Sequence, residues 1–253
     1  MYEMRNLKTR EKIAVEALFV DLDGTLVDSI EAYAEAVKQG LASIGITKFD
    51  KRIVKAIAKN FEMNRPLEPL LQPIIQKIMP QKVSAMGMPP LTSNFVENYL
   101  KTYYAVTATK CKPLKNVHRT LQTLSKRLPL VLITMRFISK EQAVSELKCL
   151  GFCSFFQEVV TARDIEKPKP HPDSLVKSAR KLNVSLERCA IVGDSIVDVK
   201  AGKAADAKTV AVLTGLYTQE ELEKEKPDLI LKSINQLPKF LIFPEKAETK
   251  STT

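Results

Sequence analysis

The sequence predicts an α/β protein, with a parallel sheet covered by helices on both faces and an all-helical insertion after the first strand. Three observations lead to this fold class. The apolar segment Ala17–Val20 has the character of a buried strand. Between about residues 30 and 112, apolar residues recur only at helical spacing. From Pro113 onward, short apolar strands alternate with helices, a pattern typical of a parallel sheet.

The elements follow in a regular order. In the insertion, helical spacing covers residues 31–44, 51–60, 67–78 and 92–106, with prolines between the helices. After the insertion, we expect strands at residues 130–134, 155–160, 190–193, 209–213 and 229–231. Helices are expected at residues 117–126, 139–150, 173–182 and 196–205, and from Gln219. The acidic sequence GDSIVD, residues 193–198, spans the junction between the third of these strands and the helix after it.

These patterns divide the chain into domains. We predict that residues 1–29 and 113–244 form the α/β core and that residues 30–112 form a separate helical unit. The polar residues 245–253 are predicted to be a disordered tail.

Composition limits the function classes. Of the 253 residues, 45% are hydrophobic and 27% charged, which is ordinary for a globular protein. No apolar run approaches the roughly 18 residues that a membrane span needs. The N-terminal residues are polar and charged, without the apolar segment of a secretory signal. We therefore expect a cytoplasmic protein that does not associate with a membrane.

Cysteines and net charge add further limits. The four cysteines form no CxxC pair and the two histidines lack metal-ligand spacing, so we expect reduced thiols and no zinc site. The net charge of +10 can attract polyanions. However, the basic clusters carry neither interleaved aromatic residues nor a nucleic-acid motif, which argues against a nucleic-acid partner. A monomer and a homodimer both remain open.

Two carboxylates follow the first strand. Asp21 and Asp23 stand one residue apart, and residues i and i+2 of a strand point to the same side. Two such carboxylates repel each other, and a magnesium ion would relieve that repulsion because it binds hard oxygen ligands. Gly24 then allows the sharp turn that leaves the strand.

The run DLDGTLVDS at residues 21–29 resembles the first motif of the haloacid dehalogenase superfamily, most closely its phosphatases of the phosphoglycolate phosphatase type. The resemblance implies a Rossmann-like core, with Asp21 as nucleophile and Asp23 as general acid and base. The dehalogenase branch of the family lacks the second carboxylate. Its presence here as Asp23 points to phosphoryl transfer. By the same resemblance, Thr25 would keep Asp23 turned away from Asp21 and help to bind the substrate.

The second motif of the family is a Ser or Thr that closes an apolar strand, and Thr134 matches it. Its hydroxyl and the next backbone N–H would hold a phosphoryl oxygen. The family often has Asn or Ser at the next position, but here Met135 follows, and then Arg136. We expect Arg136 to take over part of the missing substrate contact.

The third motif is a lysine that offsets the charge of the nucleophile and binds the phosphoryl group. The sequence KPHPD selects Lys169, and the prolines around it fix the direction of the backbone. Lys167 is left open as the alternative. His171 in the same loop is expected to cap or pack rather than to act as a base.

The fourth motif is the sequence GDSIVD, at the junction of a strand and a helix. Asp194 would complete the Mg²⁺ shell together with Asp21 and the backbone carbonyl of Asp23. Asp198 lies four residues later, one helical turn on, and would support the shell or Lys169. All four motifs appear in the family's order, each at the end of a predicted strand.

The helical insertion lies where this family places a small mobile cap, which reads the leaving group of the substrate. Our candidates for substrate binding there are Arg52 and Arg65, with Asn60 and Asn64 beside them. An arginine could pair with a substrate carboxylate through two hydrogen bonds. The glycine-rich loop of many phosphoglycolate phosphatases is replaced here by the sequence NFEMN, so phosphoglycolate itself is not indicated.

The resemblance therefore implies a Mg²⁺-dependent phosphatase of a small phosphorylated metabolite, acting through an aspartyl-phosphate. Phosphoglycolate-like molecules and sugar phosphates are both open as substrates. The first alternative is a sugar-phosphate mutase, which is built on the same core. The second is a non-catalytic anion-binding protein, although Asp21, Asp23, Lys169 and Asp194 are all present.

Overall fold

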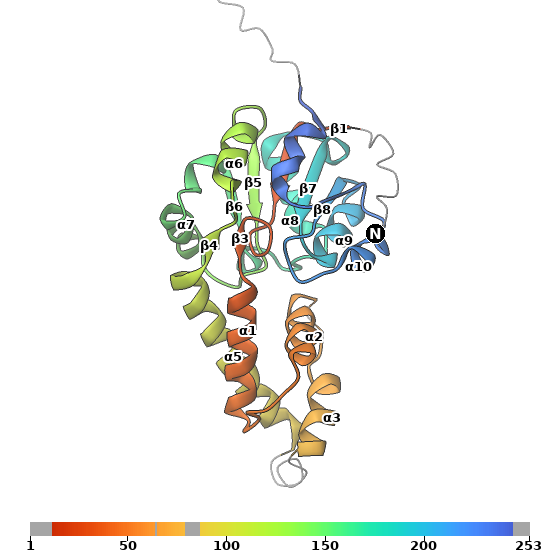
Figure 1. Ribbon diagram of the computed structural model, residues 1–253. Coiled ribbons are helices and arrows are strands. Elements are labelled where there is room, and N and C mark those ends of the chain that lie inside the picture. The colour runs from red at the N-terminus through yellow and green to blue at the C-terminus, as the bar shows by residue number, and fades with distance from the viewer. Residues whose placement is uncertain (1–11, 64, 79–86, 245–253) are drawn as a thin grey trace, which may run out of the picture.

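The computed structural model of the chain describes residues 12–63, 65–78 and 87–244. Its centre is a parallel sheet of six strands (Figure 1). Their spatial order is β6 (Glu158–Val160), β5 (Leu130–Ile133), β2 (Ala17–Val20), β7 (Cys189–Gly193), β8 (Lys208–Val212) and β9 (Leu229–Leu231). Adjacent strands of this sheet all pair in parallel, as the sequence predicted.

The central strands are apolar and buried along their whole length, because helices cover both faces of the sheet. The covering helices of the core are α6 (Val117–Ser125), α7 (Lys140–Cys149), α8 (Asp173–Leu182), α9 (Ile196–Ala204) and α10 (Gln219–Glu223). Short 3-10 turns complete the connections: η1 (Cys153–Phe155), η2 (Ala162–Asp164), η3 (Leu186–Arg188) and η4 (Ile234–Lys239). The predicted N-cap at Ser139 is confirmed, since its hydroxyl accepts a hydrogen bond from Gln142 N at 3.2 Å.

Four two-residue strands were not predicted from the sequence. β1 (Ile13–Ala14) pairs in parallel with β10 (Leu241–Ile242), and β3 (Val27–Asp28) pairs antiparallel with β4 (Lys112–Pro113). Two residues are too few to show a period, so pattern analysis has no signal for them. The β3–β4 pair brings together the two places where the chain leaves and re-enters the core.

The helices between β3 and β4 form the cap: α1 (Ile30–Ser43), α2 (Lys51–Glu62), α3 (Glu68–Ile78) and α5 (Met88–Lys110). In Figure 1, α1 and α5 run side by side away from the sheet, and α2 and α3 lie beside them. Close packing requires a small residue at Gly40 of α1, where an added Cβ would lie 2.8 Å from the Phe95 ring. Helical spacing thus predicted these elements, while the exact limits proposed for the domains stay a prediction.

Two predicted boundaries were wrong. The last cap helix begins at Met88 rather than at residue 92, and Pro89 and Pro90 lie in its first turn. Proline is tolerated there because the N–H groups of the first turn have no hydrogen-bond partner within the helix. The predicted strand at residues 155–160 is shorter, since Phe155 lies in a 3-10 turn and only Glu158–Val160 pairs with β5.

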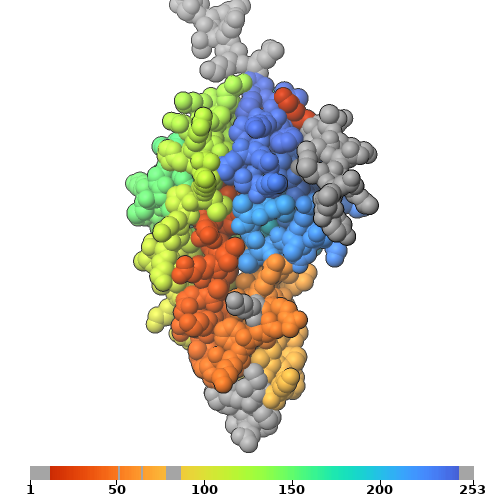
Figure 2. Space-filling model, in the orientation of Figure 1, coloured from red at the N-terminus to blue at the C-terminus, as the bar shows by residue number. Residues whose placement is uncertain are grey.

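Among the described residues, polar contacts join the cap to the core on two sides. Lys59 of α2 forms an ion pair with Glu221 of α10 and lies 4.5 Å from the centre of the Tyr217 ring. On the other side, the Tyr104 hydroxyl of α5 accepts a hydrogen bond from Phe137 N at 3.0 Å. Figure 2 shows the cap as a narrower body in contact with the wider core.

Two limits set by composition are met within the described residues. None of the helices described is long and apolar enough to cross a bilayer. All four cysteines are free, in agreement with the predicted reduced thiols.

Candidate active site

The carboxyl edge of the sheet holds the predicted catalytic residues. Asp21 follows β2, Thr134 follows β5 and Asp194 follows β7, while Lys169 comes from the loop before α8. Parallel sheets bind ligands at this edge. A cavity of about 460 Å³ opens there between the sheet and the cap, and Asp21, Asp23, Lys169, Asp194 and Asp198 all line it.

Lys169 is the buried cation of the site. Its Nζ donates to Asp21 Oδ1 at 2.7 Å, to Asp198 Oδ1 at 2.5 Å and to the carbonyl of Ile133 at 3.1 Å. Burial works against the charged ammonium, but Asp198 and Asp21 outweigh it and raise the pKa of Lys169. Lys169 therefore remains charged, with each of its three N–H groups directed at an oxygen.

The groups around Asp21 have opposing effects on the pKa of its carboxyl. Burial raises the pKa of its carboxyl, Lys169 lowers it and Asp198 raises it again, which leaves a pKa of about 7. The charged form is therefore poorly stabilised by the described side chains alone. Burial likewise raises the pKa of Asp194 far above its ordinary value, with Glu62, Asp21 and Asp198 adding to the shift.

Asp21, Asp194 and Asp198 form a cluster that fits a divalent cation. Each can offer a carboxylate oxygen, these oxygens lie within 4.8 Å of one another, and all three residues are buried. The chain makes room for Asp194, since an added Cβ on Gly215 would lie 1.6 Å from its Oδ2. Crowded, buried carboxylate oxygens are the kind of donor set that Mg²⁺ binds. Asp198 is partly committed elsewhere, because its Oδ2 also accepts from Ser195 N at 3.2 Å.

Arg136 is committed to protein carboxylates. Its Nε donates to Asp23 Oδ2 at 2.7 Å and its Nη2 to Asp23 Oδ1 at 2.6 Å, while its Nη1 pairs with Glu146 of α7. Arg136 is 4% exposed, so this arrangement is dry. The arginine expected to contact substrate directly is instead a bidentate clamp on Asp23, although it does line the cavity.

The two threonines of the motifs lie at the site with other partners than predicted. The Thr25 hydroxyl donates to Asp194 Oδ1 at 3.2 Å, so it orients Asp194 rather than Asp23, and Arg136 is what holds Asp23. Thr134 is buried, and its Oγ1 accepts a hydrogen bond from Arg136 N at 3.2 Å. Thr134 thus fixes the turn that carries Arg136.

Three of the cap residues predicted to bind substrate, Arg52, Asn60 and Arg65, do not line this cavity. The Arg52 side chain is 91% exposed and bonds to Asp50, two residues before it, at the start of α2. Arg65 is exposed, and Asn60 donates to the carbonyl of Pro66 at 2.9 Å. Asn64 lies outside the described residues.

The two candidate lysines for the third motif lie in different environments in the loop before α8. Lys167 is exposed, whereas Lys169 is buried at the carboxylates. His171 pairs with the neighbouring Asp173 at 2.8 Å, half exposed, which agrees with a capping or packing role.

Sequence reasoning missed the cap side of the cavity. Glu62, the last residue of α2, reaches the cavity, and so do several aromatic residues. Tyr99 stacks on Phe61 with ring centres 3.7 Å apart, and Tyr103 lies 5.1 Å from Tyr33. The spacing of Phe95, Tyr99 and Tyr103, each four residues after the last, could have revealed this aromatic face of α5.

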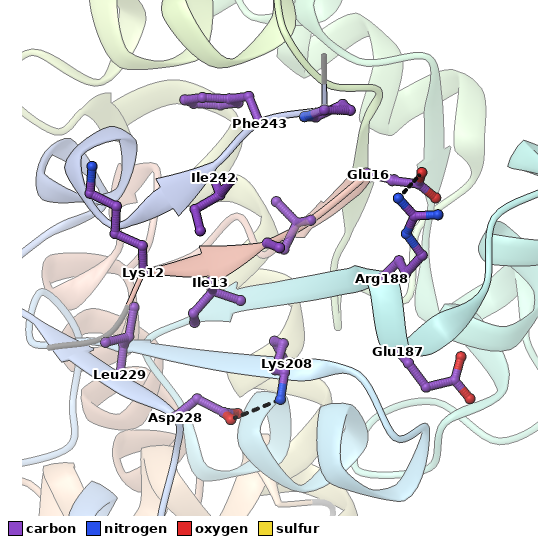
Figure 3. Close-up of a pocket in the computed structure, with 13 residues that line it drawn as sticks. Lys12, Ile13, Glu16, Glu187, Arg188, Lys208, Asp228, Leu229, Ile242 and Phe243 are labelled. Carbon is purple, nitrogen blue, oxygen red and sulfur yellow. Dashed lines mark ion pairs between the residues drawn. The ribbon is translucent and has the colours of Figure 1, made fainter.

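A second hollow lies at the opposite end of the sheet (Figure 3). Among its lining residues, Arg188 pairs with Glu16 at 2.6 Å and Lys208 with Asp228 at 3.7 Å. None of the residues of the four motifs lines it. The residues of the four motifs therefore gather at the carboxyl edge and not at this hollow.

The buried acids predict an unusual pH dependence of stability in the absence of divalent cations. The pKa of Asp21 rises from 3.8 to about 7 and that of Glu62 from 4.5 to about 8, chiefly through burial. Between these limits the folded chain binds more protons than the unfolded chain, so stability falls as pH rises. We expect the free energy of unfolding in chelator to drop by at least about 2 kcal/mol between about pH 5 and pH 8.

Urea unfolding at both pH values measures this drop. Added Mg²⁺ should restore stability at the higher pH, and Glu62→Gln should reduce the pH dependence. If the protein in chelator were more stable at about pH 8 than at about pH 5, the prediction would be contradicted.

Comparison with known proteins agrees with this geometry. Residues 18–212 match the model of the haloacid dehalogenase-like hydrolase family. Phosphoglycolate phosphatase of Escherichia coli K12 is 29% identical over 248 residues, covering 94% of this chain and 96% of that protein. Pyrophosphatase PpaX of Anoxybacillus flavithermus is 27% identical over 228 residues, covering 90% of this chain and 97% of that protein.

Solved structures show the same fold. A haloacid dehalogenase-like hydrolase of Streptococcus pneumoniae superposes with a TM-score of 0.70 at 22% identity, covering 89% of this chain and 98% of that one. A putative beta-phosphoglucomutase of Thermotoga maritima superposes with a TM-score of 0.63 at 23% identity, covering 88% and 96%. The chain belongs to the haloacid dehalogenase-like hydrolase family, and within it to enzymes of the phosphatase type.

Proposed function

We propose that this protein is a Mg²⁺-dependent phosphatase that hydrolyses a small phosphate monoester through an aspartyl-phosphate on Asp21. The observation that carries the proposal is the position of Lys169, whose ammonium joins Asp21 to Asp198 beside Asp194 in a cavity large enough for a small metabolite. This set of groups combines a nucleophile, a fixed cation and a cation-binding carboxylate cluster at one sheet edge.

In the first step, a carboxylate oxygen of Asp21 attacks phosphorus and the bond to the leaving oxygen breaks. Lys169 holds Asp21 in place and offsets negative charge on the phosphoryl group. In the second step, water attacks phosphorus, which releases phosphate and regenerates Asp21. Residues Asp21, Asp194 and the backbone carbonyl of Asp23 would hold the metal ion, with Asp198 in support. When bound, the ion would supply positive charge that keeps Asp21 ionised and stabilises the phosphoryl group during transfer.

Asp23 is proposed to protonate the leaving alcohol and then to take a proton from the attacking water. While Arg136 occupies both of its oxygens, Asp23 cannot carry a proton on either of them without losing a hydrogen bond. We therefore propose that a phosphoryl oxygen draws one N–H of Arg136 away from Asp23 when substrate binds. That exchange would free the acid only in the occupied site.

The test is phosphate release from an aryl phosphate, with Mg²⁺ and with chelator, using the Asp21→Asn protein from the same purification as control. Turnover that requires both Mg²⁺ and Asp21 is the expected result. Turnover that persists in chelator would overturn the Mg²⁺ requirement. A phosphotransferase would instead isomerise a hexose phosphate without releasing phosphate, and a binding protein would do neither.

A further inference from the structure

The cap end of the catalytic cavity carries a carboxyl oxygen without a hydrogen-bond partner. Glu62 closes α2, and its Oε2 is shielded from solvent without a hydrogen-bond partner among the described residues. A buried acceptor without a partner costs free energy, so its persistence here indicates a group that arrives with the ligand.

The charge of the cavity restricts what that ligand can be. Five carboxylates line the cavity within the described chain: Asp21, Asp23, Glu62, Asp194 and Asp198. Its described basic side chains are Lys169 and Arg136, and both already bind protein carboxylates. Among the described residues, the cavity therefore offers no free cation to a second anionic group of a substrate. To a cationic group it offers the carboxyl of Glu62, whose Oε2 has no hydrogen-bond partner.

The wall around Glu62 is aromatic. Phe61, Tyr33, Tyr99 and Tyr103 line the same cavity, and Tyr99 lies flat against Phe61. The faces of such rings carry negative electrostatic potential and attract cations. Aromatic lining and carboxyl charge therefore favour the same ligand.

We propose that this cavity takes the phosphate monoester of an amino alcohol, with the substrate's ammonium group bound by Glu62 against the tyrosine wall. The inference rests on the phosphatase function proposed above and specifies its leaving group. Glu62 and Asp21 line the same cavity. The phosphate ester of an amino alcohol bound in that cavity would place its phosphoryl group at Asp21 and direct its amine toward Glu62.

The electrostatic state of Glu62 supports this reading. Burial raises the pKa of Glu62 to about 8, the Tyr33 hydroxyl partly offsets that rise, and Asp198 and Asp21 increase it. An ammonium group next to the carboxyl would supply the missing opposite charge. Phosphoglycolate would instead bring a carboxylate toward Glu62, and pyrophosphate would bring a second phosphoryl group.

The test compares three two-carbon phosphate esters that differ mainly in the terminal group: 2-aminoethyl phosphate, 2-hydroxyethyl phosphate and phosphoglycolate. The wild-type protein with Mg²⁺ should show a kcat/KM at least about tenfold higher for the ammonium ester than for the carboxylate ester. Glu62→Gln should reduce that ratio by about tenfold, because the amide keeps the shape and removes the charge. Glu97→Gln removes an exposed cap carboxylate and should leave the ratio unchanged.

Binding provides a readout that does not depend on turnover. Calorimetric titration of the Asp21→Asn protein with the same esters should give the same order of affinity, and adding Glu62→Gln should abolish the preference. A preference for phosphoglycolate, or a ratio that Glu62→Gln leaves unchanged, overturns the inference even if aryl phosphate is hydrolysed. Ammonium-selective binding without any turnover would support the inference and count against the phosphatase proposal.

Discussion

Replacing Asp21 by Asn is expected to lower kcat for aryl phosphate hydrolysis by about 10⁴-fold or more, because the carboxamide cannot form the aspartyl-phosphate. The fold should survive, since Asn has nearly the same shape and Lys169 keeps its bonds to Asp198 and the carbonyl of Ile133. Burial already disfavours the Asp21 charge and raises its pKa to about 7. The variant should therefore unfold in urea within about 1 kcal/mol of the native protein.

Phosphate release and urea unfolding, measured on one preparation, separate chemistry from stability. Asp206→Asn is a matched control, because Asp206 is exposed and its positive φ of 56° is one that Asn adopts readily. The control should lose no activity. If Asp21→Asn keeps more than about a tenth of the native rate, Asp21 is not the nucleophile.

Replacing Lys169 by Met should damage both activity and stability. The variant leaves Asp21 and Asp198 facing each other without their shared cation, and removal of one member of a buried ion pair costs about 3–5 kcal/mol. We expect a destabilisation of about 3 kcal/mol in chelator near pH 8, and a fall in kcat of at least about 10³-fold. The destabilisation should shrink near pH 5, where the freed carboxyls can take up protons.

Lys167→Met provides the comparison, because Lys167 stands in the same loop but is exposed. Its stability and rate should stay near native values. If Lys167→Met were the variant that loses activity, Lys169 would not be the lysine of the third motif.

The sequence predicted best those site residues whose position follows from the order of the strands. Asp21, Thr134 and Asp194 each follow a strand of the parallel sheet, so the topology alone brings them to one edge. The prolines around Lys169 mark a loop at the same edge. Strand alternation therefore predicted the fold class, and the resemblance of the motifs to the family predicted the cluster of acids with its lysine.

Contacts that long side chains make with other elements of the fold could not be predicted from the sequence. Arg136 turns to Asp23 because Glu146, ten residues later on α7, holds the other end of its guanidinium. Arg52 was assigned to substrate on charge alone, but Asp50 binds it at the helix start. Glu62 reaches the cavity because α2 packs on α10 through Lys59, a contact that no local pattern reveals.

The most direct test of the account is to look for the phosphoryl group on Asp21. Enzyme in steady turnover of an aryl phosphate is quenched in acid, digested and mapped by mass spectrometry. We predict a phosphoryl group on the peptide that contains Asp21. It should be lost on treatment with hydroxylamine and be missing from Asp21→Asn. A phosphoryl group on another residue, or full turnover with Asp21 never modified, would contradict it.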